Sequence, residues 1–171
     1  MKSIQRIALT LGFSAGLLIP SASRAEGIDP ARLQTLMDFA AEGLDVSSYE
    51  IPPPRIVYKT FEYLQVSQYG LERASGASGK VEYFYAALAV YNFDTSEMWL
   101  IEDIDYSRPE HEWVLVHELA HYFQEVYPEL YLDKVRCIIE LERSAYRVSN
   151  MWTIATGHGR VVDFIPICGD D

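Results

Sequence analysis

One five-residue motif limits what this chain can fold into more than any other feature of the sequence. Residues 117–121 are His-Glu-Leu-Ala-His, inside an apolar segment from Pro109 to about Tyr127 that predicts one long helix. On a helix, His117 and His121 lie on the same face one turn apart. Both imidazoles can therefore reach a common point, and the fold has to provide a partner for them there.

A metal ion is the partner that these side chains favour. Two imidazoles and the Glu118 carboxylate are costly to bury on an apolar helix without one. Zinc takes His nitrogens at about 2.0 to 2.1 Å in a shell that is usually tetrahedral, so two His leave room for a third ligand and a water. Glu118 then lies beside that water, where we expect it to act as a general base.

The third ligand is expected on the next predicted helix, which runs from about Asp133 to Ala155 and offers Glu140 and Glu142. Helical phase separates the two carboxylates. One broad face of this helix is mostly apolar, and its members are Ile138, Leu141, Ala145, Val148, Ser149 and Trp152. Glu142 falls inside the edge of that face and is the predicted ligand, whereas Glu140 points roughly opposite and is expected to be solvated.

The motif and the second helix together resemble a known group of enzymes. His117 to His121, followed 21 positions after His121 by Glu142-Arg143-Ser144-Ala145-Tyr146, resembles the gluzincin branch of zinc metallopeptidases, whose pattern is HExxH with a downstream Glu, often as ExxA. The resemblance implies a minimal zincin-like domain in which His117, His121 and Glu142 bind Zn²⁺ and Glu118 is the base. It also implies that the edge strand of an upstream hairpin lines a peptide cleft.

Two further features bear on this resemblance. Gln124 and Tyr127 stand where the metzincin extension would have its Gly and its third His, which favours a Glu as third ligand. The chain is also far shorter than well-known gluzincin peptidases, so we expect their extra substrate-binding domain to be missing.

Other polar side chains have less specific roles. Tyr146 lies one turn after Glu142 and is the first candidate to donate a hydrogen bond to a developing oxyanion, with packing in the core as the alternative. His111 and His158 are expected to be surface or loop histidines.

The elements before the motif predict the fold class. Asp29 and Pro30 begin an amphipathic helix that ends at Gly43, Arg55 to Lys59 is a short extended segment, and Phe61 to Tyr69 predicts a second helix. Residues 81–91 and 98–101 predict a β-hairpin with a polar turn. The expected fold is α+β, with a small antiparallel sheet or hairpin packed on a helical half.

The first 25 residues predict a secretory signal peptide. Lys2 and Arg6 precede an apolar run from Ile7 to Ile19, and Ser23 and Ala25 are the small residues of a cleavage site. The run is shorter than the roughly 20 residues that span a bilayer, so we expect no stable membrane anchor after cleavage. Residues 26–171 then form a single domain, exported to the periplasm or secreted and expected to be a monomer.

Charge and cysteines agree with an exported protein. The net charge is −11, and the predicted signal peptide carries three of the basic side chains, so nucleic acid is a poor partner for the remainder. Cys137 and Cys168 are expected to form a disulfide, with a nucleophilic Cys as the alternative.

Three functions are compatible with the sequence. The first is zinc-dependent hydrolysis of a peptide or protein substrate. The second is an exported zinc-binding or structural protein without turnover, and the third is an interaction domain in which the motif occurs by chance.

Overall fold

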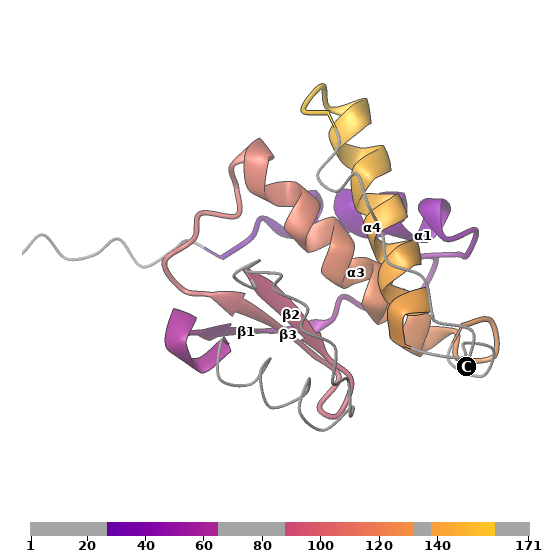
Figure 1. Ribbon diagram of the computed structural model, residues 1–171, viewed down its shortest axis with the longest axis horizontal. Coiled ribbons are helices and arrows are strands. Elements are labelled where there is room, and N and C mark those ends of the chain that lie inside the picture. The colour runs from indigo at the N-terminus through magenta and orange to yellow at the C-terminus, as the bar shows by residue number, and fades with distance from the viewer. Residues whose placement is uncertain (1–26, 65–87, 132–137, 160–171) are drawn as a thin grey trace, which may run out of the picture.

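The computed structural model describes residues 27–64, 88–131 and 138–159. The predicted signal peptide, Cys137 and Cys168 lie outside these residues. Within them the chain is α+β, with a three-stranded sheet below a group of helices (Figure 1). The predicted fold class is confirmed at that level.

The first helix forms where the sequence predicted it. α1 spans Pro30–Gly43, and the Asp29 side chain accepts a hydrogen bond from the Ala31 N–H at its N-terminus. Residues 61–64 are helical as well, and the rest of the predicted second helix lies outside the described residues.

The two long helices carry the motif and its predicted partner. A short 3₁₀ turn, η1 (Pro109–His111), precedes α3 (Glu112–Val126), so the single predicted helix is two elements. α4 spans Ile138–Ala155. In Figure 1, α3 lies between the sheet and α4, which makes it the central element of the fold.

The sheet corrects one expectation. β2 (Ala89–Asn92) and β3 (Glu97–Ile101) form the predicted antiparallel hairpin, but β1 (Arg55–Lys59) pairs with β3 in parallel. The sheet is therefore mixed, in the order β1-β3-β2. β1 and β3 run in the same direction although β2 lies between them in sequence, so their pairing is non-local.

Strand alternation divides the core into two parts. Met98 and Leu100 are fully buried in the main cluster, together with α1, α3 and α4 residues. Their neighbours Trp99 and Ile101 point to the opposite face, where they pack with Leu64. The upper face of the sheet thus supports α3.

A partly buried ion pair fixes the start of α3. The Arg32 guanidinium donates from Nε and Nη2 to the two oxygens of Glu112, at 2.6 and 2.7 Å. Glu112 is 2% exposed, and Arg32 also lies over the Trp152 ring, 5.2 Å from its centroid. This bidentate pair joins α1 to the first turn of α3, with α4 packed beside it.

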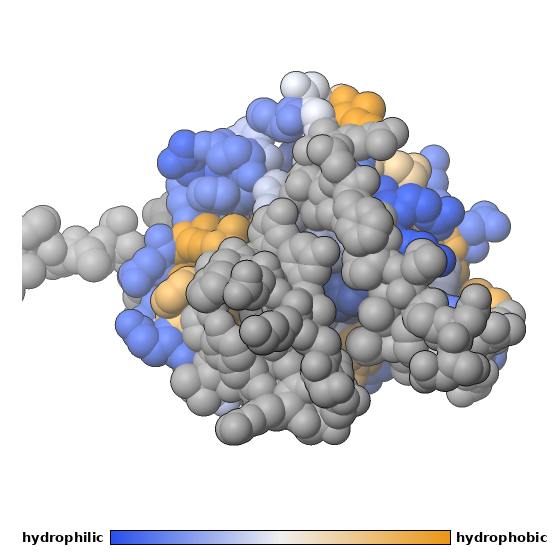
Figure 2. Space-filling view, in the orientation of Figure 1, coloured by the Kyte–Doolittle hydropathy of each residue, from blue (hydrophilic) through white to orange (hydrophobic). Residues whose placement is uncertain are grey.

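The described surface is largely hydrophilic in the view of Figure 2, with apolar residues in small separate patches. No described helix combines the length and the apolar character that crossing a bilayer requires.

The contact between Gly43 and Val148 gives a test of how closely α1 and α4 pack. A Cβ added at Gly43 would lie 2.8 and 3.0 Å from the two methyl groups of Val148, which are fixed close to the α4 backbone. We expect Gly43→Ala to lower the free energy of unfolding by about 1 to 3 kcal/mol, although Ala ordinarily stabilises a helix relative to Gly.

The matched control for this prediction is the double variant Gly43→Ala, Val148→Ala. Urea unfolding should show that the second change recovers stability relative to Gly43→Ala alone. A Gly43→Ala variant as stable as the unmodified protein would contradict the close packing.

Candidate metal centre

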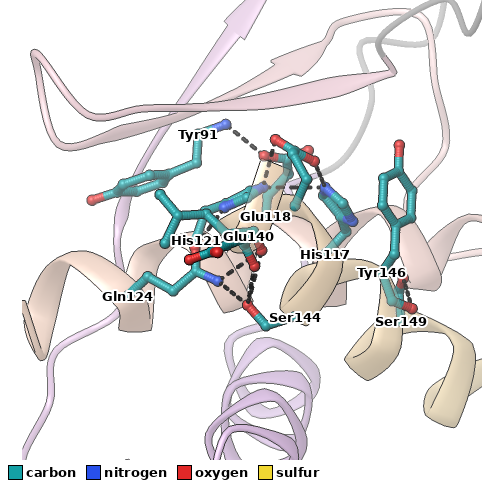
Figure 3. A network of polar contacts seen from close by, with 11 residues as sticks. Tyr91, His117, Glu118, His121, Gln124, Glu140, Ser144, Tyr146 and Ser149 are labelled. Carbon is teal, nitrogen blue, oxygen red and sulfur yellow. Dashed lines mark hydrogen bonds and ion pairs between the residues drawn. The ribbon is translucent and has the colours of Figure 1, made fainter. Parts of the chain in front are cut away.

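α3 and α4 bring three ligand atoms together as the sequence predicted. Nε2 of His117 lies 3.2 Å from Oε2 of Glu142, and Nε2 of His121 lies 3.3 Å from Oε1 of the same carboxylate. The two Nε2 atoms are 3.2 Å apart. In the described part of the chain, these three residues are the group that could hold a metal ion. Figure 3 shows both rings turned toward one point.

The spacing of these atoms fits a metal ion. In a tetrahedral shell with arms of about 2.0 to 2.1 Å, two ligand atoms are about 3.3 to 3.4 Å apart. The two Nε2 atoms, 3.2 Å apart, agree with that edge length, and each of them faces a different oxygen of the Glu142 carboxylate, at 3.2 and 3.3 Å. Two His and one Glu are also a ligand set found in catalytic zinc sites with one open position. The residues therefore fit a zinc ion, although the same ligand types accept other divalent metals.

The two rings are buried and the carboxylate reaches them from the surface. The side chains of His117 and His121 are 9% and 5% exposed, whereas Glu142 keeps 37% of its side-chain surface exposed. The Glu142 carboxylate nevertheless contacts both buried rings.

Opposite charges couple His121 and Glu142. Burial by itself lowers the pKa of His121, but the negative charge of Glu142 and its hydrogen bond outweigh burial and raise that pKa to about 9. Burial conversely raises the pKa of Glu142, and the two imidazoles outweigh it and hold that pKa well below its usual range. The metal-free centre is thus an ion pair at neutral pH.

Glu118 lies beside this group with a different environment. It is 7% exposed, and burial raises the pKa of its carboxyl against the opposing effect of the two imidazoles. Its Oε2 accepts a hydrogen bond of 2.6 Å from the backbone N–H of Tyr91 on β2. A carboxylate with a raised pKa next to a metal-ligand group suits a general base.

Among the described strands β2 stands at the edge of the sheet, and its outer side faces the centre. The N–H of Ile101 donates to the Leu88 carbonyl, and hydrogen-bonded pairs in an antiparallel ladder recur every second residue. Ala89 and Tyr91 therefore direct their peptide groups away from β3, which is why the Tyr91 N–H can reach Glu118. The tyrosine side chain continues to α3, where its hydroxyl donates to Glu125 at 2.6 Å.

Aromatic rings border the two imidazoles. The Tyr146 ring lies against His117 with 4.3 Å between ring centroids, and Phe93 meets His121 edge-on at 5.8 Å. The predicted candidate Tyr146 thus lies at the centre, one turn after Glu142 on α4 (Figure 3). Phe93 is a neighbour that the sequence did not single out, because the hairpin turn alone places it there.

Gln124 belongs to this centre although the sequence patterns gave it no role there. It is fully buried on α3, and its Oε1 lies 2.8 Å from Nδ1 of His121. In the motif comparison it mattered only as a departure from the metzincin Gly. Its place three residues after His121, on the same helix face, is the signal that could have identified it.

The structure also shows which of the other predicted residues lie at this centre. Glu142 and not Glu140 belongs to the group of three ligands. His111 binds the Asp105 carbonyl through Nδ1, and His158 is exposed, so neither is part of the centre. The predicted pairing of Cys137 with Cys168 falls outside the described residues.

Comparisons with known protein families, with curated proteins and with solved structures found no match to this chain. The resemblance to gluzincins therefore rests on the motif and on the spacing to Glu142 in the sequence.

Proposed function

We propose that this protein is a zinc-dependent hydrolase, acting on a peptide or protein substrate. The observation that supports this most directly is the convergence of two imidazoles and one carboxylate, at the spacing of a tetrahedral shell, beside the buried Glu118. We also propose that the chain is exported, on the basis of the predicted signal peptide in residues 1–25.

The chemistry divides between the ion and the chain. A bound zinc supplies a Lewis acid that polarises a carbonyl and lowers the pKa of a water molecule. Glu118 takes a proton as general base, and burial has raised its pKa toward the range in which it can accept that proton and pass it on. The Tyr91 N–H holds Oε2 of Glu118 and so fixes the orientation of the carboxylate.

Two further groups complete the proposed site. The other outward peptide groups of β2, those of Ala89 and the Tyr91 carbonyl, can pair with an extended substrate by strand addition, because hydrogen bonds to the backbone need no particular side chain. Tyr146 lies against His117, where its hydroxyl is the candidate donor to a developing oxyanion. The substrate would then lie between the hairpin and α4.

The ligand assignment is tested by comparing two carboxylates on one helix. We expect the purified protein to hold about one zinc per chain, Glu142→Gln to weaken zinc binding by at least roughly tenfold, and Glu140→Gln to leave it unchanged. Elemental analysis and chelator competition measure both quantities. Equal affinities for the two variants would contradict Glu142 as a ligand, and a protein without zinc affinity would contradict the metal centre.

The base is tested by Glu118→Gln, which keeps the size of the side chain and removes the basic oxygen. We expect hydrolysis of a peptide library, followed by mass spectrometry, to fall roughly 10²- to 10⁴-fold while zinc affinity stays within a few-fold. Glu110→Gln on η1 is the matched surface control and should change neither. Retained activity in Glu118→Gln argues against this base, and an unmodified zinc protein without any activity supports the non-catalytic alternative.

The ion pair at the metal-free centre predicts proton release on metal binding. Because the pKa of His121 is raised to about 9, its ring holds a proton at pH 7.5 that an incoming ion must displace. Calorimetry in buffers with different ionisation enthalpies should therefore report about one proton released per zinc at pH 7.5. The number should fall toward zero as the pH rises above about 9, and a value that does not change with pH would contradict the raised pKa.

A further inference from the structure

The amide of Gln124 connects the metal-ligand group to α4. Oε1 lies 2.8 Å from Nδ1 of His121, while Nε2 lies 3.0 Å from the Leu141 carbonyl and 2.7 Å from Oγ of Ser144. Gln124 is 0% exposed, so its amide forms these hydrogen bonds with protein groups in place of water. Figure 3 shows the amide between His121 on one side and Ser144 on the other.

The carbonyl of Leu141 determines which way this amide faces. A backbone carbonyl can only accept a hydrogen bond, so the NH₂ group of Gln124 has to face Leu141. The Ser144 hydroxyl donates to the same carbonyl at 2.9 Å, which leaves its oxygen able to accept from Gln124. Reversing the amide would place Oε1 against the Leu141 carbonyl with no proton between them.

The orientation of the amide in turn determines the tautomer of His121. Oε1 can only accept, so Nδ1 of His121 carries a proton that it donates to Gln124. In a neutral ring the lone pair is then on Nε2, the atom that faces His117 and Glu142. His117 differs, because its buried Nδ1 has no hydrogen-bond partner among the described residues.

We infer that Gln124 is a positioning residue that fixes the tautomer and ring orientation of His121 for metal binding. This inference rests on the proposed metal centre. The contacts with Leu141 and Ser144 on α4 set which way the amide faces, and the contact with His121 is the one that acts on a ligand. Removing a group that hydrogen-bonds to a metal ligand typically weakens metal binding roughly 10- to 100-fold.

Three variants test this role. Gln124→Met removes both the acceptor and the donors with little change in volume. Gln124→Glu keeps an oxygen that can accept from His121 but weakens the contact with α4. Thr153→Val is the matched control, because Thr153 is a buried α4 residue, 3% exposed, whose hydroxyl donates to the Asn150 carbonyl away from the centre.

Chelator competition measures the zinc affinity, and thermal unfolding measures the stability, of the unmodified protein and of all three variants. We expect Gln124→Met to weaken zinc binding roughly 10- to 100-fold, and Gln124→Glu and Thr153→Val to stay within about threefold even where they lower the melting temperature. Affinity and stability thus change independently, which a purely structural role does not predict. Equal affinity in Gln124→Met and Thr153→Val overturns the inference, and so does an equal loss in all three variants.

A second measurement applies even where a variant fails to fold. In the zinc-loaded unmodified protein, nitrogen NMR should place the ring proton of His121 on Nδ1 and show that it exchanges slowly with solvent, since it is buried and hydrogen-bonded. A proton on Nε2 overturns the inference. An unmodified protein that binds no zinc contradicts the metal centre itself, which is a different result from an unaltered affinity in Gln124→Met.

Discussion

The contact between α3 and α4 is the constraint on which the candidate site depends. α3 supplies His117, Glu118 and His121, and only the adjacent helix brings Glu142 within 3.3 Å of the rings. α3 is held from three directions: by the sheet below it, by α4 beside it and by the Arg32–Glu112 ion pair at its start (Figure 1). Ligand positions on packed helices vary less than positions on loops, so this arrangement favours a preorganised centre.

Helical periodicity explains why so much of the centre could be predicted from sequence. Two positions four residues apart always share a helix face, and the apolar face of α4 is enough by itself to separate Glu142 from Glu140. The sheet was less predictable because strand pairing is non-local. The hairpin follows from two neighbouring apolar runs, whereas the parallel pairing of β1 with β3 joins strands that residues 60–96 separate in sequence, β2 among them, and no local pattern encodes it.

The contacts that refine the centre were not predictable for the same reason. A peptide N–H on β2 meets Glu118 only because the hairpin packs beside α3 with its free edge toward the helix. Gln124 had a local signal in its helical position, but its contacts with Leu141 and Ser144 depend on how α4 packs on α3. Sequence patterns thus identified the residues with distinctive chemistry, and the packing revealed the neutral groups that orient them.

The polar character of the centre is difficult to explain by stability alone. Buried imidazoles and carboxylates cost several kcal/mol unless they are paired, and apolar residues of similar volume at these positions would pack into the core without that cost. In this chain Glu118 is buried with a raised pKa, and Nδ1 of His117 is buried without a partner among the described residues. An ion pair between His121 and Glu142 offsets the cost of burying those two side chains, but it leaves the burial of His117 and Glu118 unexplained. The proposed metal ion, bound by both imidazoles and Glu142 with Glu118 beside it, would give these four side chains a common role.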